Sequence, residues 1–388
     1  MPVINRIAEF HPEIVGWRHD FHQNPELLYD VHRTSARVAD LLRSFGVDEV
    51  VTGLGRTGVV GLIHGRNGPG GRVVGLRADM DALPITERTG KAHASKVAGK
   101  MHACGHDGHT AMLLGAAKYL AETRNFAGTV AVIFQPAEEG GGGGKAMIAD
   151  GLMDRFAIEE VYGLHNMPGH AAGTFAIKAG GIMAATDEFV IEVEGVGGHA
   201  AMPHMTTDPV LTAANIVVAL QSIMGRNVDP MKNAVVSVTV IRSHGEASNV
   251  VPRSVTIKGT VRTLETDVQS MIERRIAQIA TGVAEGFGAK ATASYRRGYP
   301  VTVNHAAQAA FAAGVARDVA GAERVDDNTT GVMGGEDFSF MLNERPGAYI
   351  FLGNGQTSEL HTDTYDFNDD IIPVGVSYWV RLAETALA

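Results

Sequence analysis

Residues 108–134 read GHTAMLLGAAKYLAETRNFAGTVAVIF. The first part, 108–123, is predicted to be a helix, and the nearly continuous apolar run at 128–134 predicts a strand that is covered on both faces. A helix that alternates with such strands is typical of α/β domains built on a largely parallel sheet. We therefore expect this stretch to lie in the core of an α/β domain.

The same alternation extends toward both ends of the chain. Upstream, the pattern predicts two helices and two apolar strands, at 3–22, 33–45, 58–64 and 72–78. After residue 299 the α/β character returns, with a helix, a short strand at 347–352 and a closing helix from about residue 370. One sheet is thus assembled from both ends of the sequence.

The intervening segment has a different character. Residues 188–194, EFVIEVE, alternate apolar with polar side chains, as expected for a strand with one solvent-exposed face. Together with this strand, the elements that follow make the β-α-β-β-α-β order of a ferredoxin-like sandwich. They are predicted at 208–224 (helix), 234–242 and 254–263 (strands), 266–286 (helix) and 289–297 (strand).

Length and charge set the broad class of protein. A chain of 388 residues suggests two domains, and we predict one formed by 1–183 with 299–388 and an inserted one at 184–298. The formal net charge of -10, without a basic stripe, argues against a nucleic-acid partner. No signal peptide and no apolar stretch of roughly 18 residues is found. We expect a cytoplasmic protein that binds a small molecule and no membrane.

The densest group of potential metal ligands surrounds the only cysteine. The sequence MHACGHDGHT, which ends at Thr110, places Cys104, His106, Asp107 and His109 within six residues. Thiolate, imidazole and carboxylate groups this close together are what a borderline-soft divalent metal selects. The alternative is a helix start with Asp107 or Thr110 as its cap and Cys104 packed in the core. Three histidines beside the one cysteine favour the metal site.

Two strand ends carry further candidates. Glu138 and Glu139 follow the predicted strand 128–134 after a proline turn, and His165 ends another apolar run. Open α/β sheets hold their sites at the carboxyl ends of strands, which favours a functional role over a solvated acidic turn. One carboxylate can bind a metal while its neighbour acts as a general base. His361 lies in a polar loop, where an isolated histidine is usually a surface residue.

Motifs of other chemistries are absent or misplaced. Gly53–Gly58 matches the dinucleotide fingerprint by letter, but it leads into a predicted strand instead of opening a helix. Gly140–Lys145 lacks the first glycine and the Mg-binding hydroxyl of a phosphate loop. Neither Gly-x-Ser-x-Gly nor His-Glu-x-x-His occurs, which argues against an α/β-hydrolase and a helical zincin.

Six segments together resemble the M20 metallopeptidase and amidohydrolase family, and within it the branch of hippurate hydrolases and auxin-conjugate hydrolases. They are RADMDALP (77–84), MHACGHDGH (101–109), FQPAEE (134–139), GGHAAMPH (197–204), NVVP (249–252) and MGGEDF (333–338). The resemblance implies a mixed, largely parallel, zinc-peptidase-like sheet flanked by helices. It identifies the segment at 184–298 as an inserted ferredoxin-like lid and dimerisation domain.

The resemblance also implies a centre of two divalent metal ions per subunit, zinc or manganese, with cobalt or nickel as alternatives. Its ligands would be Cys104, His106, Glu139, His165 and His361. Glu138 would be the general base that acts on a metal-bound water. Asp79 and Asp81 stand where most of the family has a His-x-Asp ligand motif, and Asp81 is expected to orient a ligand without touching the metal.

Two candidate residues belong to the insertion. His199 follows glycines at a strand end, which lets the backbone turn and expose the imidazole, although an ordinary turn histidine would look the same. In similar proteins a histidine at this place reaches the partner subunit's site and stabilises the oxyanion, and an asparagine at the place of Asn249 contacts the substrate. The resemblance therefore implies a homodimer, with a tetramer as the alternative.

The activity implied by the resemblance is hydrolysis of the amide bond of a small N-acyl amino acid, such as hippurate or an N-acetyl amino acid. Dipeptides and N-acetyl-diaminopimelate are alternative substrates of the same chemistry. A non-catalytic metal-binding protein is the alternative from a different class. Such a protein would have lost Glu138 or a metal ligand, and none of these is missing.

Overall fold

The computed structural model describes residues 4–388, which form two compact units. Unit 1 contains the described chain up to Gly180, Val303–Thr330 and Asp337–Ala388, and unit 2 contains Gly181–Thr302 and Gly331–Glu336. The insertion expected at 184–298 falls inside unit 2. Short strands β7 (Gly180–Met183) and β14 (Thr302–Asn304) stand near the unit boundaries in the sequence.

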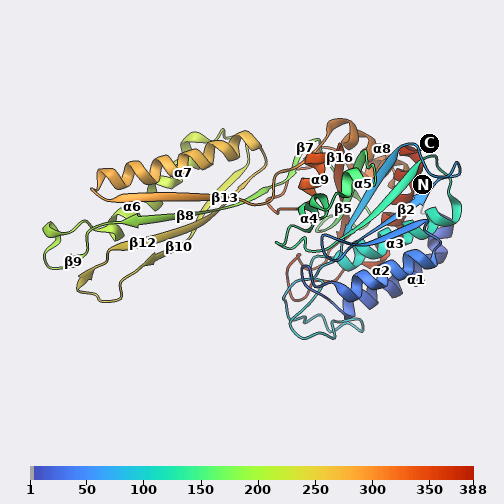
Figure 1. The fold of residues 1–388 in the computed structure, drawn as a ribbon, viewed down its shortest axis with the longest axis horizontal. Coiled ribbons are helices and arrows are strands. Elements are labelled where there is room, and N and C mark those ends of the chain that lie inside the picture. Colours follow the sequence, from blue (N-terminus) through green and yellow to red (C-terminus); the bar gives the residue numbers. More distant parts are fainter. Residues whose placement is uncertain (1–3) are drawn as a thin grey trace. The chain divides into compact units, whose positions relative to one another are not determined.

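Unit 1 is built on an eight-stranded mixed sheet (Figure 1). Its strands lie in the order β1 (Glu49–Leu54), β2 (Gly58–His64), β4 (Thr129–Gln135), β3 (Val73–Asp79), β5 (Glu160–Pro168), β16 (Gly347–Gly355), β6 (Phe175–Ala176) and β15 (Val325–Asp326). The central pairs from β4 through β3 and β5 to β16 are parallel, whereas β1 and β2 pair antiparallel. The largely parallel α/β sheet predicted from the sequence is confirmed.

Strands β3 and β4 are buried at every position, which explains why their sequences are mostly apolar; Arg77 and Asp79 of β3 are buried charged residues. The helices of unit 1 are α1 (Asn5–Gln23), α2 (His32–Ser44), α3 (His106–Thr123), α4 (Gly143–Ala149), α5 (Leu152–Arg155), α8 (Ala306–Ala320), α9 (Phe338–Glu344) and α10 (Ile372–Ala386). Helix α3 packs against β3, α1 and α10, so most of its circumference is buried. Residue 3, where the first predicted helix begins, lies outside the described residues.

Unit 2 is an α+β sandwich. Its four-stranded sheet has the order β10 (Ala234–Ser243), β12 (Ser254–Thr263), β8 (Ala185–Glu194) and β13 (Lys290–Arg297), and every adjacent pair is antiparallel. Helices α6 (Pro209–Ser222) and α7 (Thr266–Gly286) pack on this sheet and on each other. Strand β8 alternates buried with more exposed residues, as its sequence pattern predicts. The element order is the expected β-α-β-β-α-β.

Two local features of unit 2 were not expected. The helix predicted at 208–224 ends as an α-helix at Ser222 and continues as a π-helical turn, Ile223–Asn227. A small two-stranded sheet forms between β9 (Gly198–His199) and β11 (Val250–Val251). Among residues 4–388, no helix is both long enough and apolar enough to cross a membrane.

Candidate metal centre

The carboxyl ends of neighbouring parallel strands bring the candidate residues of unit 1 together. Strand β3 ends at Asp79, strand β4 ends just before Glu138, and β5 carries His165. Ala137 has a φ of +56°, an uncommon value for a residue with a side chain. This sharp turn after β4 delivers Glu138 and Glu139 to the same edge of the sheet, where open α/β folds hold their sites.

A glycine separates the two candidate ligands at the start of α3. Gly105 lies between Cys104 and His106 with a φ of +90°, in the left-handed region that favours glycine. A Cβ atom at this position would come within 2.1 Å of Oδ1 of Asn166. The close approach of α3 to β5 therefore depends on a residue without a side chain.

Six predicted residues converge within unit 1. Their potential ligand atoms form three groups, each with all atoms within 4.8 Å of one another: Cys104–His106–His165, Cys104–Glu139–His361 and His106–Glu138–Glu139. Sγ of Cys104 lies 3.4 Å from Nε2 of His165, and Nε2 of His361 lies 3.4 Å from Oε1 of Glu139. Cys104 belongs to two groups, which places its sulfur where two ions could share it.

The buried polar atoms of this region fit a cation. Nε2 of His106 and Oε1 of Glu139 are buried without a hydrogen-bond partner, which is costly unless a further group satisfies them. Nδ1 of His106 donates to the backbone carbonyl of Asp81 at 2.8 Å, and Nδ1 of His165 donates to that of Asn166 at 2.6 Å. These bonds leave both Nε2 lone pairs directed toward the site, as in metal-binding histidines.

The electrostatics of the centre also favour positive charge. Burial alone would lower the pKa of His106, but the carboxylates of Asp79, Asp81 and Glu139 raise it to about 10. The pKa of His165 is held well below its usual range, chiefly by burial and by the neighbouring histidines. One imidazole is thus surrounded by negative charge, and the other is neutral and free to act as a ligand.

Asp81 fastens the turn that carries the paired glutamates. Its Oδ1 accepts the backbone N–H of Glu138 at 2.9 Å, and its Oδ2 accepts that of Glu139 at 3.1 Å. Oδ1 also lies 3.5 Å from Nδ1 of His106. Asp81 is fully buried, so these contacts are shielded from water. Asp81 thus fixes the backbone of both glutamates.

His109 was a candidate ligand in the sequence cluster, but both of its ring nitrogens are hydrogen-bonded to other side chains. Its Nδ1 lies 2.6 Å from Oδ1 of Asp79 and its Nε2 lies 2.7 Å from Oδ1 of Asn166. Asp79 in turn accepts a hydrogen bond from the buried Arg77 at 2.8 Å. Arg77 and Asn166 were not proposed as site residues from the sequence. For Arg77 the only local signal was its place at the head of the RADMDALP segment.

His361 has an unusual backbone conformation. Its side chain is 53% exposed, and its φ is +62°. Its backbone N–H donates to the carbonyl of Ala103 at 2.8 Å, directly before Cys104. This bond holds the loop against the start of α3. An isolated histidine in a polar loop is thereby placed beside Glu139.

His199 and Asn249 belong to unit 2. His199 lies in β9, opposite Val250 in β11, and the N–H of Ala200 donates to the carbonyl of Asn249 at 3.0 Å. Both side chains are exposed. The structure thus brings these two residues next to each other, on a unit that does not contain the six residues of the candidate centre.

Known proteins are similar to this one over nearly its whole length. The sequence model of peptidase family M20/M25/M40 matches residues 75–385. The chain belongs to this family. It is 42% identical to the hippurate hydrolase of Campylobacter jejuni, with 99% of each chain covered, and 38% identical to the N-acetyl-L-cysteine deacetylase of Bacillus subtilis, with 96% and 88% covered. The resemblance to the M20 family and its hippurate hydrolase branch is confirmed.

A solved structure extends the comparison to the fold. The crystal structure of a dinuclear metal-binding peptidase of the M20 family from Bacillus subtilis superposes with a TM-score of 0.86 at 32% identity, covering 98% of this chain and 99% of that one. The chain is therefore an M20-type amidohydrolase with the α/β fold predicted from its sequence.

Proposed function

We propose that this enzyme uses two divalent metal ions to hydrolyse the amide bond of small N-acyl amino acids. The observation that carries the proposal is the convergence of a thiolate, three imidazoles and two carboxylates, with His106 Nε2 and Glu139 Oε1 each buried without a hydrogen bond. The names of the two relatives, a hippurate hydrolase and an N-acetyl-L-cysteine deacetylase, support an acyl group on an amino acid as the substrate.

The proposed ligands are Cys104, His106, Glu139, His165 and His361. When bound, the metal ions would lower the pKa of a water molecule and polarise the carbonyl of the scissile amide. A thiolate among imidazole and carboxylate donors favours zinc, whereas the nitrogen and oxygen donors also suit manganese, cobalt or nickel. A free cysteine as ligand accords with a cytoplasmic location, which we also propose.

Glu138 is the proposed general base. Its carboxylate belongs to one of the three donor groups, and its backbone N–H is fixed by Asp81 at 2.9 Å. It would take a proton from the attacking water and then pass that proton to the leaving amine, so that one carboxylate serves as base and then as acid. Its neighbour Glu139 faces His361 and is the proposed ligand.

We further propose that unit 2 is the lid and dimerisation domain and that each active site uses His199 of the partner subunit to stabilise the oxyanion. Asn249, next to His199 in the small sheet, would contact the substrate. Exposed apolar side chains on α6 and on the edge strand β10 support a subunit interface on this unit: Val210, Leu211, Val218, Val240 and Ile241. A homodimer is the simplest assembly, with a tetramer as the alternative.

The test of the proposed reaction is a panel of benzoyl-, acetyl- and aliphatic-acyl amino acids, with dipeptides and N-acetyl-diaminopimelate as competing classes. Purified protein is assayed for release of free amino acid with zinc or manganese and after treatment with a chelator. We expect metal-dependent cleavage that is fastest for N-acyl amino acids. Exclusive cleavage of dipeptides, or no cleavage by protein that carries two metal ions, would contradict the proposal.

The shared active site is tested by complementation. Glu138→Gln and His199→Ala homodimers should each be nearly inactive. Random exchange of their subunits should restore about a quarter of wild-type activity, because half of the dimers are mixed and each mixed dimer contains one complete site. Sites formed within a single chain would show no recovery.

A further inference from the structure

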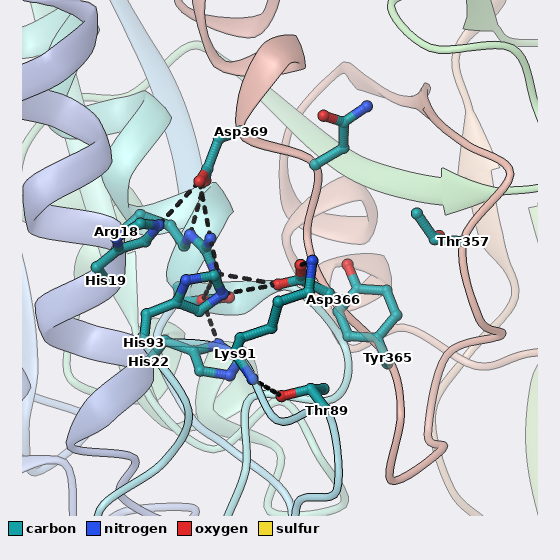
Figure 2. Close-up of polar contacts among 12 residues, drawn as sticks. Arg18, His19, His22, Thr89, Lys91, His93, Thr357, Tyr365, Asp366 and Asp369 are labelled. Carbon is teal, nitrogen blue, oxygen red and sulfur yellow. Dashed lines mark hydrogen bonds and ion pairs between the residues drawn. The ribbon is translucent and has the colours of Figure 1, made fainter.

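A cluster of charged side chains surrounds Arg18 (Figure 2) and lies outside the donor groups of the candidate centre. Arg18 of α1 is at its middle and has no exposed surface. Its Nε and Nη2 donate to the two carboxylate oxygens of Asp369 at 2.8 and 2.9 Å. Its Nη1 lies 3.5 Å from Oδ2 of Asp107 and 3.5 Å from Oδ1 of Asp366. One guanidinium therefore contacts three carboxylates.

These carboxylates belong to two of the segments that carry proposed ligands. Asp107 directly follows His106 at the start of α3, whereas Asp366 and Asp369 follow His361 in the loop before α10. Arg18 itself comes from a third segment, the N-terminal helix. It thus joins the segment of one proposed ligand to the segment of another, and neither ligand lies near it in the sequence.

Further contacts hold the same loop beside the proposed ligands. The N–H of His361 donates to Ala103, and the hydroxyl of the fully buried Tyr365 accepts a hydrogen bond from Nδ2 of Asn166 at 2.6 Å, next to His165. These contacts fix the loop near the metal side. Arg18 contacts the end of the loop nearest α10 through two charged residues, Asp366 and Asp369.

Each of the three carboxylates also has a second basic partner. His22 lies between Asp107, at 2.8 Å, and Glu87, at 3.3 Å, and Lys91 lies 3.1 Å from Asp366. His19 lies 2.8 Å from Asp369, and His93 lies 3.0 Å from Asp366. None of them spans the α3 segment and the loop, whereas Arg18 contacts both.

We infer that Arg18 is a positioning residue of the metal centre, which holds His361 in register with His106 and so sets the affinity for the ion that His361 helps to bind. The inference rests on the ligand set proposed above. Lysine cannot replace it, because a single ammonium lacks the planar fork that reaches three carboxylates at once. Removing the guanidinium would take away the cation that Asp107, Asp366 and Asp369 share, and the loop would move to relieve the repulsion among the three carboxylates.

The experiment measures zinc binding by the full-length protein, by elemental analysis and by competition with a metal-buffering chelator. Arg18→Lys and Arg18→Met should lower the affinity for one of the two ions about 10–100-fold, the range typical of residues that orient metal ligands. Asp369→Asn, a change at the edge of the cluster, should also lower the affinity for that ion. Arg6→Lys and Arg6→Met are the matched controls, because Arg6 is on the same helix but pairs with exposed Glu9 and Glu122.

A double-mutant cycle separates positioning from a general loss of stability. If Arg18 acts through His361, Arg18→Lys combined with His361→Ala should weaken zinc binding no more than His361→Ala alone. The cobalt-substituted Arg18→Lys protein should also show an altered visible absorption spectrum, which a merely less stable fold would not produce.

Two outcomes overturn the inference. Unchanged zinc affinity in folded Arg18→Lys and Asp369→Asn proteins, or fully additive effects with His361→Ala, rejects the role of Arg18 while the ligand set stands. Wild-type protein that binds fewer than two ions, or His361→Ala protein that binds zinc normally, rejects the proposed ligand set and this inference with it.

Discussion

Asp81 and Glu138 are 57 residues apart in the sequence, yet Oδ1 of Asp81 accepts the backbone N–H of Glu138 at 2.9 Å. The second oxygen of the same carboxylate accepts the N–H of Glu139 at 3.1 Å. One buried side chain therefore positions the backbone of both the proposed base and its neighbouring ligand. An asparagine at position 81 offers only one acceptor oxygen and would turn an N–H group toward the other donor.

We expect Asp81→Asn to lower kcat about 10–100-fold while the protein remains folded, as is typical of groups that orient catalytic ligands. Steady-state kinetics at saturating metal, with circular dichroism as a check of folding, tests this expectation. The control is Asp150→Asn, since Asp150 also accepts a backbone N–H, from Gly55 at 2.7 Å, outside the donor groups. Equal effects of the two changes would argue against a special role for Asp81.

Substitutions of the two adjacent glutamates, Glu138 and Glu139, should have different effects on kcat and on metal content. Glu138→Gln is expected to lower kcat by roughly 10²–10⁴-fold, the usual contribution of a general base, with both metal ions retained. Glu139→Gln should instead reduce the metal content, because Glu139 is the carboxylate that faces His361. Metal analysis of the two purified variants beside their kinetics checks this. Loss of metal from Glu138→Gln would reverse the assigned roles.

The stability of the protein should depend on pH through His22. Burial alone would lower the pKa of His22, but Asp107 and Glu87 raise it to about 9, against an opposing effect of Arg18. Because the pKa is higher in the folded protein than its ordinary value of 6.5, the stabilising contribution is complete below pH 6.5 and is lost as the pH rises through 9. The rings of His93 and His102 also face His22.

Chemical unfolding of wild-type and His22→Gln proteins between pH 6 and 9.5 measures this contribution. The chelator is present throughout, because metal binding is itself pH-dependent. We expect the difference in unfolding midpoint between the wild-type and His22→Gln proteins to become smaller as the pH rises. His32→Gln serves as the control, since the side chain of His32 is 76% exposed. If this difference between the wild-type and His22→Gln proteins stayed constant from pH 6 to 9.5, His22 would not be protonated in the folded protein.

Gly105 should tolerate no side chain. Gly105→Ala combines a left-handed backbone, at a cost of about 1–2 kcal/mol, with a contact of 2.1 Å to Asn166, which must move. We expect a lower thermal midpoint and weaker metal binding. Gly68→Ala shares the positive φ, at +77°, but its Cβ would meet no atom within 4 Å. The difference between the two variants therefore isolates the effect of the contact at α3.

The sequence by itself determined the main elements and the chemistry of the donors. Strands β3 and β4 and helix α3 are buried on nearly all sides, so their apolar runs are long and their local pattern is unambiguous. Strand β8 has one exposed face and alternates accordingly. Cys104, His106 and the glutamate pair stood out because metal-binding side chains are rarely so close together in a sequence without a function.

Only the tertiary structure decided which groups are free to bind a metal and which are not. His109 and His106 look alike in the sequence, but Asp79 and Asn166 occupy both ring nitrogens of His109 and leave Nε2 of His106 open. Arg18 resembles a surface residue of an amphipathic helix, and its burial depends on Asp369, 351 positions away. Such pairings follow from the packing of distant segments, so they cannot be predicted from a local pattern of residues.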